Sequence, residues 1–527
     1  MIRDIINHLI NQYVSQIPPQ HEIVFLKDPQ IGDYASNIAF LLSKIQNRPS
    51  LEIAHELQKK LISHQDIFDD VQVAGNGFIN FIINNRLLFY ELEKVAKPDF
   101  GKIDLGQSKK ILVEYISANP TGPLNVVQAR AGAFGNALVN LLRYVNYDVS
   151  SEYYINDMGT QVDLLYESLL ARIKQIQGEN TPLPENGYPG NYLVEIGNLI
   201  LKNNLPHSEW RSFLLNQIIQ MQKESLAKFG IIFDNFIRES SVAGYQKLIL
   251  EKLSPWTYEK DNALWFKSSQ FGDTEDRVLI TADKRPTYFL SDLAYHWYKF
   301  ERHYEHLINI WGPDHHGYIA RMKGGIACLG FNPNQLTIII AQQVSLTRNN
   351  QKIAMSKRQG EFITLDEILT EIGADALKFF LLMRKASQHL TFDLALAQKT
   401  SQENPVYYVQ YAHARINSII KFAQEKITGD LSQPDLTSLT TSAERELIRM
   451  LLHFPEVIAT AAINFEPHHL IYYALELATT FHKFYENVRV VTDNIPITSA
   501  RVYLCRATQK ILKEILSIIG VSAPEKM

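Results

Sequence analysis

Residues 109–130, KKILVEYISANPTGPLNVVQAR, constrain the fold more than any other part of the chain. The first eight are mostly apolar and β-branched, which is typical of a buried parallel strand. Pro120, Gly122 and Pro123 then break the chain, and the Ala-rich segment 129–145 follows with helical spacing. Free N–H groups and the helix dipole point into such a turn and attract anions. The stretch therefore predicts a nucleotide-binding α/β fold.

Three regions with different patterns divide the 527 residues. Residues 1–95 combine an amphipathic helix with two strand-like runs around a Gly-Asn-Gly turn, which predicts a small α/β domain. From 108 to 390 strands and helices alternate as in a doubly wound parallel sheet, with RVLITA, HLINIWG and LTIIIAQQV as expected strands and 173–191 as a loop-rich insertion. Residues 395–527 carry long helical patterns and predict an all-α bundle.

Bulk properties are those of an ordinary globular protein. The formal net charge of -4 means that any polyanion must be bound by local patches. Cys328 and Cys505 are far apart, which suits a reducing compartment and argues against a structural zinc site. No apolar run is long enough for a membrane span, and the start MIRDIINHLINQYV lacks the pattern of a secretory signal. We expect a cytoplasmic protein without a membrane partner.

Nine separated segments resemble those of arginyl-tRNA synthetases, a family of class I aminoacyl-tRNA synthetases, in the order of the family. They are GDYASNIAF, VEYISANPTGPL, EYYINDMGTQVDLL, TYFLSDLAYH, WGPDHHGYIARM, AMSKRQGEFITL, GADALKFFLLMR, NPVYYVQYAHARI and APEKM. The resemblance implies a class I parallel-sheet core, an N-terminal domain that contacts the tRNA elbow and a C-terminal helical domain that reads the anticodon.

The reaction that the resemblance implies has two steps. Arginine and ATP, which is bound with Mg²⁺, give arginyl-adenylate and pyrophosphate, and arginine then passes to the 3′ end of tRNA(Arg). Catalysis of this kind depends on positioning and on groups that stabilise charge on the phosphates. The implied partners are therefore L-arginine, ATP and tRNA(Arg). We expect no metal ion held by the protein itself, and a monomer.

The arginine site that the resemblance implies consists of Glu114, Asn119, Tyr288, Asp292 and His316. A planar guanidinium with five donors needs a carboxylate and polar acceptors at fixed angles. The i, i+4 spacing of Tyr288 and Asp292 places both on one face if their segment is helical. His315 is adjacent to His316, and we expect at least one of the two to contact the substrate.

The segment AMSKRQG resembles the family's KMSKS loop, whose lysines stabilise the triphosphate. Met355, Ser356 and Lys357 are the implied ATP-binding residues, and Lys357 is a catalytic candidate. Ala354 stands at the first lysine position, and Lys352 is a displaced cation. This half of the ATP site is expected to be weakened.

The signature turn of the family, His-x-Gly-His, is altered in this chain. Asn125 and Gln128 replace the two histidines and remain the catalytic candidates, because an amide can still donate to phosphate, though more weakly than a charged group. Val127 replaces the glycine against which adenine lies, and the extra side chain is expected to cost about 1–3 kcal/mol. Pro120 and Gly122 complete the implied ATP-binding turn.

The tRNA-binding candidates lie at both ends of the chain. Tyr408, Tyr411 and Arg415 belong to the helical segment NPVYYVQYAHARI, and aromatic and Arg side chains stack on splayed RNA bases. A core aromatic stripe accounts for some residues of this segment. Phe78 and Asn80 mark the expected contact with the tRNA elbow.

Three hypotheses about function remain open. The first is an arginyl-tRNA synthetase with an unusual signature turn, and the whole-length resemblance favours it. The second is a catalytically impaired or inactive paralogue that binds tRNA or arginine, and the altered turn favours it. The third is an enzyme that activates arginine with ATP for another acceptor.

Overall fold

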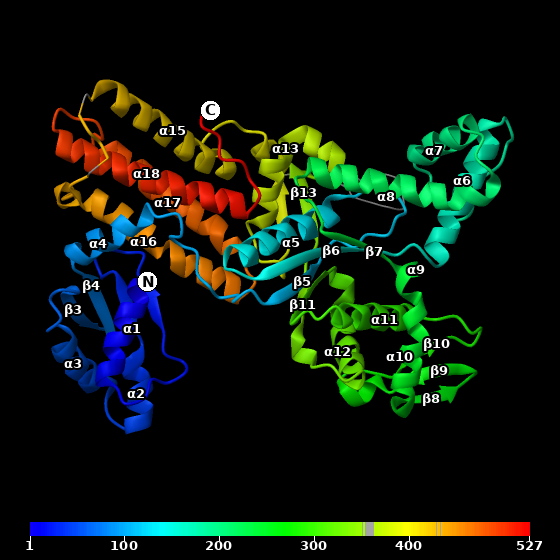
Figure 1. Cartoon of the computed structure of the whole chain (residues 1–527), viewed down its shortest axis with the longest axis horizontal. Helices are drawn as coiled ribbons and strands as arrows, with labels where there is room; N and C mark the ends of the chain where they lie inside the picture. Colours follow the sequence, from blue (N-terminus) through cyan, green and yellow to red (C-terminus); the bar gives the residue numbers. More distant parts are fainter. Residues whose placement is uncertain (350, 354–362, 428, 433) are drawn as a thin grey trace.

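The computed structural model describes residues 1–349, 351–353, 363–427, 429–432 and 434–527. Figure 1 shows an N-terminal α/β domain at one end, a helical domain beside it and a central parallel sheet from which two insertions extend. No helix in the described ranges combines the length and the apolar character that crossing a membrane requires.

The N-terminal domain packs its helices on a four-stranded antiparallel sheet of order β1-β2-β4-β3. Its elements are α1 (Ile2–Tyr13), β1 (Ile23–Phe25), β2 (Tyr34–Ser36), α2 (Ile38–Gln46), α3 (Ser50–Leu61), β3 (Phe68–Ala74), β4 (Phe78–Ile83) and α4 (Asn85–Val95). The Gly-Asn-Gly turn joins β3 to β4, as the sequence predicts.

The central sheet has five parallel strands in the order β12-β11-β5-β6-β7. Its strands are β5 (Lys110–Glu114), β6 (Asp148–Ile155), β7 (Asn235–Arg238), β11 (His306–Trp311) and β12 (Leu336–Ile340). The chain proceeds outward from β5 to β7 and then returns to the other side of β5, so the strand order reverses between β5 and β11. Ligands of doubly wound sheets bind at this point, beyond the carboxyl ends of the strands. The expected class I parallel core is confirmed.

Helices cover the central sheet and lead into a smaller sheet. The covering helices include α5 (Val126–Tyr144), α11 (Tyr288–Glu301), α12 (Ile319–Cys328) and α13 (Leu365–Leu382). The smaller sheet, of order β14-β13-β15, contains β13 (Val344–Arg348), β14 (Gln351–Lys352) and β15 (Leu390–Asp393), and α14 (Leu394–Ala397) follows it.

One strand prediction is wrong. RVLITA forms β10 (Arg277–Ile280), which pairs with β9 (Ala263–Phe266) in a separate antiparallel sheet that also contains β8 (Thr257–Lys260). A short apolar run predicts a strand but does not specify the sheet in which it pairs. The short helices α9 (Glu239–Val242) and α10 (Gln246–Leu253) lead from β7 to this sheet.

The second insertion is a helical arm, at the right of Figure 1. It contains α6 (Thr160–Ile176), α7 (Asn191–Lys202) and α8 (Trp210–Lys228), with the expected loop between α6 and α7. The arm has a hydrophobic cluster of its own, which includes Leu165, Leu193 and Ile218. The outer part of the arm therefore has a small core separate from that of the sheet, whereas Ile219 and Leu226 of α8 belong to the main cluster.

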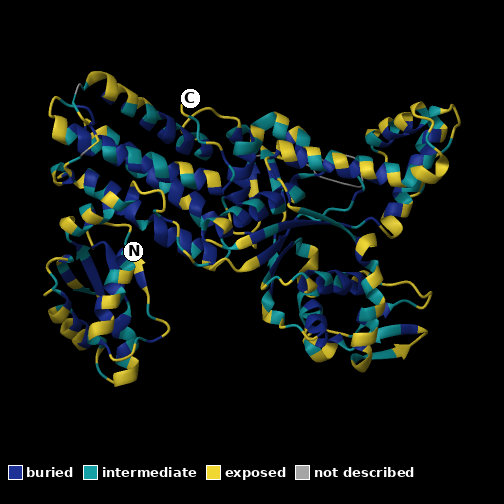
Figure 2. Cartoon of the chain, viewed as in Figure 1, coloured by how far each residue is buried: buried dark blue, intermediate teal, exposed yellow. Residues whose placement is uncertain are grey.

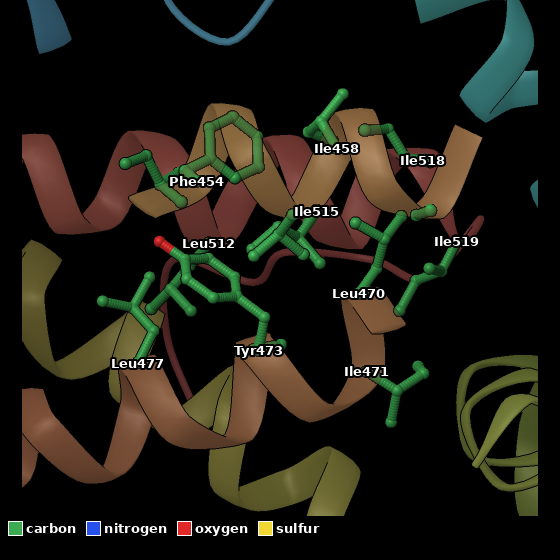
Figure 3. Packing of buried hydrophobic residues seen from close by; sticks show 14 of the residues in the cluster. Phe454, Ile458, Leu470, Ile471, Tyr473, Leu477, Leu512, Ile515, Ile518 and Ile519 are labelled. Carbon is green, nitrogen blue, oxygen red and sulfur yellow. The ribbon is translucent and has the colours of Figure 1, made fainter. Parts of the chain in front are cut away.

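The C-terminal domain is the predicted helical bundle. It contains α15 (Pro405–Lys426), α16 (Ser442–Ile463), α17 (His468–Asn487) and α18 (Ile495–Ile518). Figure 3 shows the interior, where Phe454 and Ile458 of α16 meet Tyr473 of α17 and Ile515 of α18. Figure 2 shows the same inward-facing burial along these helices and along the central strands.

A buried ion-pair cluster fastens the N-terminal domain to the bundle. Asp33, 1 % exposed, precedes β2 and pairs with Arg445 and Arg449 of α16. The Tyr34 hydroxyl donates to Glu456 Oε1 at 2.9 Å. One continuous hydrophobic cluster runs from Ile2 through α5 to the bundle, so these parts share a core.

Candidate active site

The predicted turn lies at the reversal point of the sheet, immediately after β5. Ile116 and Ser117 have φ angles of 68° and 42°, which side chains other than glycine rarely adopt. Strained backbone of this kind is concentrated at functional sites. Gly122 has φ 155°, and a Cβ there would lie 3.1 Å from the Tyr192 hydroxyl, which explains the glycine.

The helical arm braces this turn from outside. Gln222 of α8 donates from Nε2 to the carbonyl oxygens of Asn119 (3.2 Å) and Gly122 (2.8 Å). Tyr192 of α7 donates to the Thr121 carbonyl at 2.7 Å. The backbone of the turn is thus fixed by side chains that are distant in sequence.

Asn125 and Gln128 form a capping box at the start of α5. Asn125 Oδ1 accepts from Val127 N at 2.9 Å, and Gln128 Oε1 accepts from Asn125 N at 3.0 Å. Both amide oxygens are used by the backbone, which leaves the two NH₂ groups as donors. Val127 is 37 % exposed, so its side chain stands at the helix surface beside these donors.

A second helix begins next to the turn. Thr364 caps α13 and pairs with Asn125 in an antiparallel bridge, and Leu365 N donates to Leu124 O at 2.8 Å. Two helix N-termini therefore lie side by side. The positive dipole end of α5 favours an anion, whereas α13 already carries Asp366 and Glu367 in its first turn. Met355, Ser356 and Lys357 lie outside the described residues.

Asp292 lies on α11, which begins at Tyr288, so the segment of these two residues is helical. Its Oδ2 accepts a 2.7 Å hydrogen bond from the Tyr318 hydroxyl. Desolvation, together with the nearby Glu114 and Glu239, raises the pKa of Asp292 to about 7 although the Tyr318 bond and Lys299 oppose the shift. A carboxyl group so perturbed by burial and by neighbouring charges is a candidate ligand group.

Glu114 ends β5 and is 6 % exposed. Its Oε2 is paired with Lys299 of α11, and its Oε1 accepts from the Ser117 hydroxyl at 2.8 Å. Each carboxylate oxygen can accept a second hydrogen bond, so Glu114 can still contact a ligand. Its charge is balanced by Lys299.

Glu239 is a site residue that the sequence analysis missed. It follows β7 at the carboxyl edge of the sheet and is 6 % exposed. Among the described residues its Oε2 has no hydrogen-bond partner, and neither has the buried hydroxyl of Tyr154. Burial raises the pKa of Glu239. Its position directly after a strand of the parallel sheet is the signal that could have identified it.

The remaining arginine candidates surround these carboxylates to different degrees. Asn119 accepts from Asn156 Nδ2 and donates to Gln161 Oε1, both at 2.7 Å. Tyr288 is 57 % exposed. His315 and His316 are both exposed in the turn after β11, and the ring of His315 lies 5.8 Å from that of Trp311.

The bundle carries a large open pocket of about 1050 Å³ between α15 and the loop after α17. Tyr411, Arg415 and Tyr485 line it, and the Arg415 guanidinium lies 4.3 Å from the centre of the Tyr485 ring. An aromatic wall with a stacked guanidinium suits an unstacked RNA base. Tyr408 lies deeper, with its ring 4.8 Å from that of His482.

The two N-terminal candidates differ in exposure. Phe78 is 45 % exposed and its ring lies 4.8 Å from that of Phe40. Asn80 is 7 % exposed and donates to the Ile31 carbonyl at 2.9 Å, so its side chain stabilises the loop before β2.

A group with metal-ligand geometry occurs on α17, away from the pocket. Within the described ranges, Glu466, His468 and His469 are the residues that could together hold a metal ion. Glu466 is already paired with Lys385 and with His469. The ammonium of Lys385 and the positive dipole end of α17 both disfavour the binding of a cation here.

Three family descriptions match consecutive parts of the chain. "Arginyl tRNA synthetase N terminal domain" matches residues 1–83, "tRNA synthetases class I (R), catalytic domain" matches 93–185, and "DALR anticodon binding domain" matches 409–527.

Curated relatives match over nearly the whole length. The chain is 42 % identical over 522 residues to the "Arginine--tRNA ligase" of Geobacillus kaustophilus, with 95 % of this chain and 93 % of the relative covered. It is 41 % identical over 514 residues to the protein of the same name from Syntrophotalea carbinolica, with 94 % and 93 % covered.

Solved structures agree in fold. A putative arginyl-tRNA synthetase from Campylobacter jejuni, 34 % identical, superposes with a TM-score of 0.77 and covers 84 % of this chain and 99 % of that one. The arginyl-tRNA synthetase of Thermus thermophilus, 22 % identical, reaches 0.81 over the full length of both chains and supports the fold alone.

Proposed function

The chain belongs to the arginyl-tRNA synthetase family, and on that premise we propose the roles that its residues play in attaching arginine to tRNA. Like its relatives it is an arginine–tRNA ligase, which uses ATP to join L-arginine to tRNA(Arg) through an arginyl-adenylate. The near-full-length identity of about 40 % carries this conclusion, and none of these relatives supports the inactive-paralogue alternative.

The guanidinium of arginine binds between Asp292 and Glu239. The two carboxylates lie near each other, and Glu239 Oε2 is buried without a partner among the described residues. An unpaired buried acceptor is costly until a donor occupies it. Glu114 and Asn119 add further hydrogen-bond acceptors to the site, and Tyr288 adds an aromatic ring. His316, in the turn after β11, lines the remaining side.

ATP binds with its phosphates over the N-terminus of α5. The NH₂ groups of Asn125 and Gln128 donate to phosphate oxygens, and the backbone around Pro120 and Gly122 shapes the turn. Lys357, with Met355 and Ser356, supplies the remaining contacts. Mg²⁺ accompanies ATP as part of the substrate. Its positive charge offsets phosphate charge, which the neutral amides cannot do.

tRNA(Arg) binds along the N-terminal domain and the bundle. An anticodon base stacks in the pocket of Tyr411 and Arg415, and the surface around Phe78 contacts the elbow. Tyr408 and Asn80 support these surfaces from within. We assign residues 1–95 to elbow contact, 108–390 to catalysis and 395–527 to anticodon reading, in a cytoplasmic monomer.

An aminoacylation assay with purified tRNA(Arg), ATP–Mg²⁺ and radiolabelled arginine tests the function. We expect arginine to be attached and lysine to be refused, because lysine lacks the planar fork that two carboxylates can hold. Charging of tRNA(Arg) with lysine at a similar rate, or no charging at all, would contradict the proposal. Adenylate formation without tRNA transfer would favour another acceptor.

A further inference from the structure

Four side chains of α11 form one stripe that faces the central sheet. Asp292, Tyr295, His296 and Lys299 are spaced i, i+3, i+4 and i+7, so they lie on the same face of the helix. Asp292 stands at the pocket end, and Lys299, 0 % exposed, stands two turns further in. The stripe places a charged ammonium beneath the proposed arginine site.

Lys299 is held entirely by groups of this site. Its Nζ is paired with Glu114 Oε2, lies 3.1 Å from Asn309 Oδ1 and stands 4.2 Å from the centre of the Tyr295 ring. Asn309 Nδ2 in turn meets His296 Nε2 at 2.8 Å. A fully buried ammonium is tolerated only where its partners are as well placed as these.

The charges of the pocket explain why a cation is buried there. Glu114 and Glu239 lie near Asp292, and their negative charges disfavour its ionisation. A single bound guanidinium cannot compensate three carboxylates. Lys299 compensates Glu114, which leaves Asp292 and Glu239 for the ligand.

We propose that Lys299 is a positioning residue of the arginine site, whose ammonium fixes and neutralises Glu114 so that the guanidinium binds Asp292 and Glu239. This rests on the proposed function of the pocket. Lys299 does not touch the substrate and acts through the electrostatic balance of the carboxylates.

The pH dependence of the KM for arginine separates this role from simple packing. Arginine needs ionised Asp292, so KM rises as pH falls through the pKa of that group. The groups that face Asp292 are Glu114 of β5, Tyr154 of β6, Glu239 of α9, Tyr318 with Arg321 behind it, and Lys299. Lys299 lowers and Glu114 raises the pKa of Asp292, so removing each has the opposite effect.

The experiment measures kcat and KM for arginine in tRNA charging between pH 6 and 9. Lys299→Met should raise the KM for arginine about tenfold or more at pH 7.5, with kcat nearly unchanged. It should also move upward the pH midpoint at which this KM changes. Glu114→Gln should move the midpoint downward, and the double variant should return it close to the wild-type value. The control is Lys252→Met, which removes an exposed cation 4.6 Å from the centre of the Trp297 ring, on the other side of α11. This variant should change neither the KM for arginine nor its pH midpoint.

The outcomes are decisive in both directions. The proposal would be overturned if the pH midpoint of the KM for arginine were the same in all variants, or if it moved in the same direction in both single variants. If Lys299→Met does not fold, the downward shift in Glu114→Gln and its reversal in the double variant still test it. A wild type that does not charge tRNA(Arg) would instead contradict the proposed function.

Discussion

At the scale of single residues, Asp292 links arginine binding to pH. Its pKa of about 7 exceeds the usual value of about 4 for an aspartate. Asp292→Ala should weaken arginine binding by about 2–5 kcal/mol, because a buried cation loses its partner. Calorimetry with tRNA present checks this, and Asp283→Ala, which removes an exposed carboxylate of the β10–α11 loop, is the matched control. Equal affinities for both variants would contradict the assignment.

The same raised pKa makes Asp292 a source of instability in the ligand-free protein. A carboxyl group whose folded pKa is raised contributes stability that is present below its unfolded pKa, near 4, and is lost as pH rises to about 7. Asp292→Asn should therefore melt at a higher temperature than the wild type at pH 8. The difference should shrink as pH falls toward about 4, and a difference independent of pH would refute this explanation.

The altered signature turn makes a second prediction at this scale. Val127→Gly should lower the KM for ATP, since it opens the surface on which adenine lies. Restoring His at 125 and 128 should raise the rate of adenylate formation, but it removes the capping box and should cost about 0.5–2 kcal/mol of stability. Pyrophosphate exchange and thermal melting measure the two effects. A wild type that already charges at about 1 s⁻¹ or faster would show that the amides suffice.

At the scale of elements, the packing of α5 on β5 positions the turn. A Cβ at Gly135 would lie 2.3 Å from Cγ of Tyr115, the residue directly after Glu114. Gly135→Ala should therefore destabilise the protein by about 1–3 kcal/mol and raise the KM for arginine, because α5 must move away from the strand. Gly244→Ala meets no atom within 4 Å and should leave both unchanged. Melting curves and charging kinetics of the two variants decide the point.

The elements also show how far the sequence could predict the molecule. The strand, turn and helix around 109–145 were predictable because each rests on local rules, and so was the bundle. RVLITA was assigned to the wrong sheet because pairing is decided by distant residues. Glu239 and the contact of Lys299 with Glu114 were missed for a related reason, since strand order brings together side chains that no local pattern connects.

At the scale of the whole molecule, Asp33 couples the N-terminal domain to the bundle. Asp33→Asn removes the carboxylate that Arg445 and Arg449 share across this contact, although Arg449 keeps Glu446, and should cost about 3–5 kcal/mol. The N-terminal domain should then be cleaved from the rest by mild proteolysis, and the KM for tRNA should rise while that for arginine stays unchanged. Asp28→Asn, at an exposed site in the preceding loop, is the control. Unchanged proteolysis would show that the hydrophobic contacts suffice.

The separate core of the α6–α8 arm has a consequence for the lifetime of the active-site turn. An element with its own small hydrophobic cluster can unfold locally without the rest of the protein. Tyr192 of α7 lies in this cluster and holds the carbonyl oxygen of Thr121, so each opening of the cluster also releases the turn at that residue. The amide hydrogens around Thr121 should exchange with deuterium at the rate of those in α7, and much faster than those of β5.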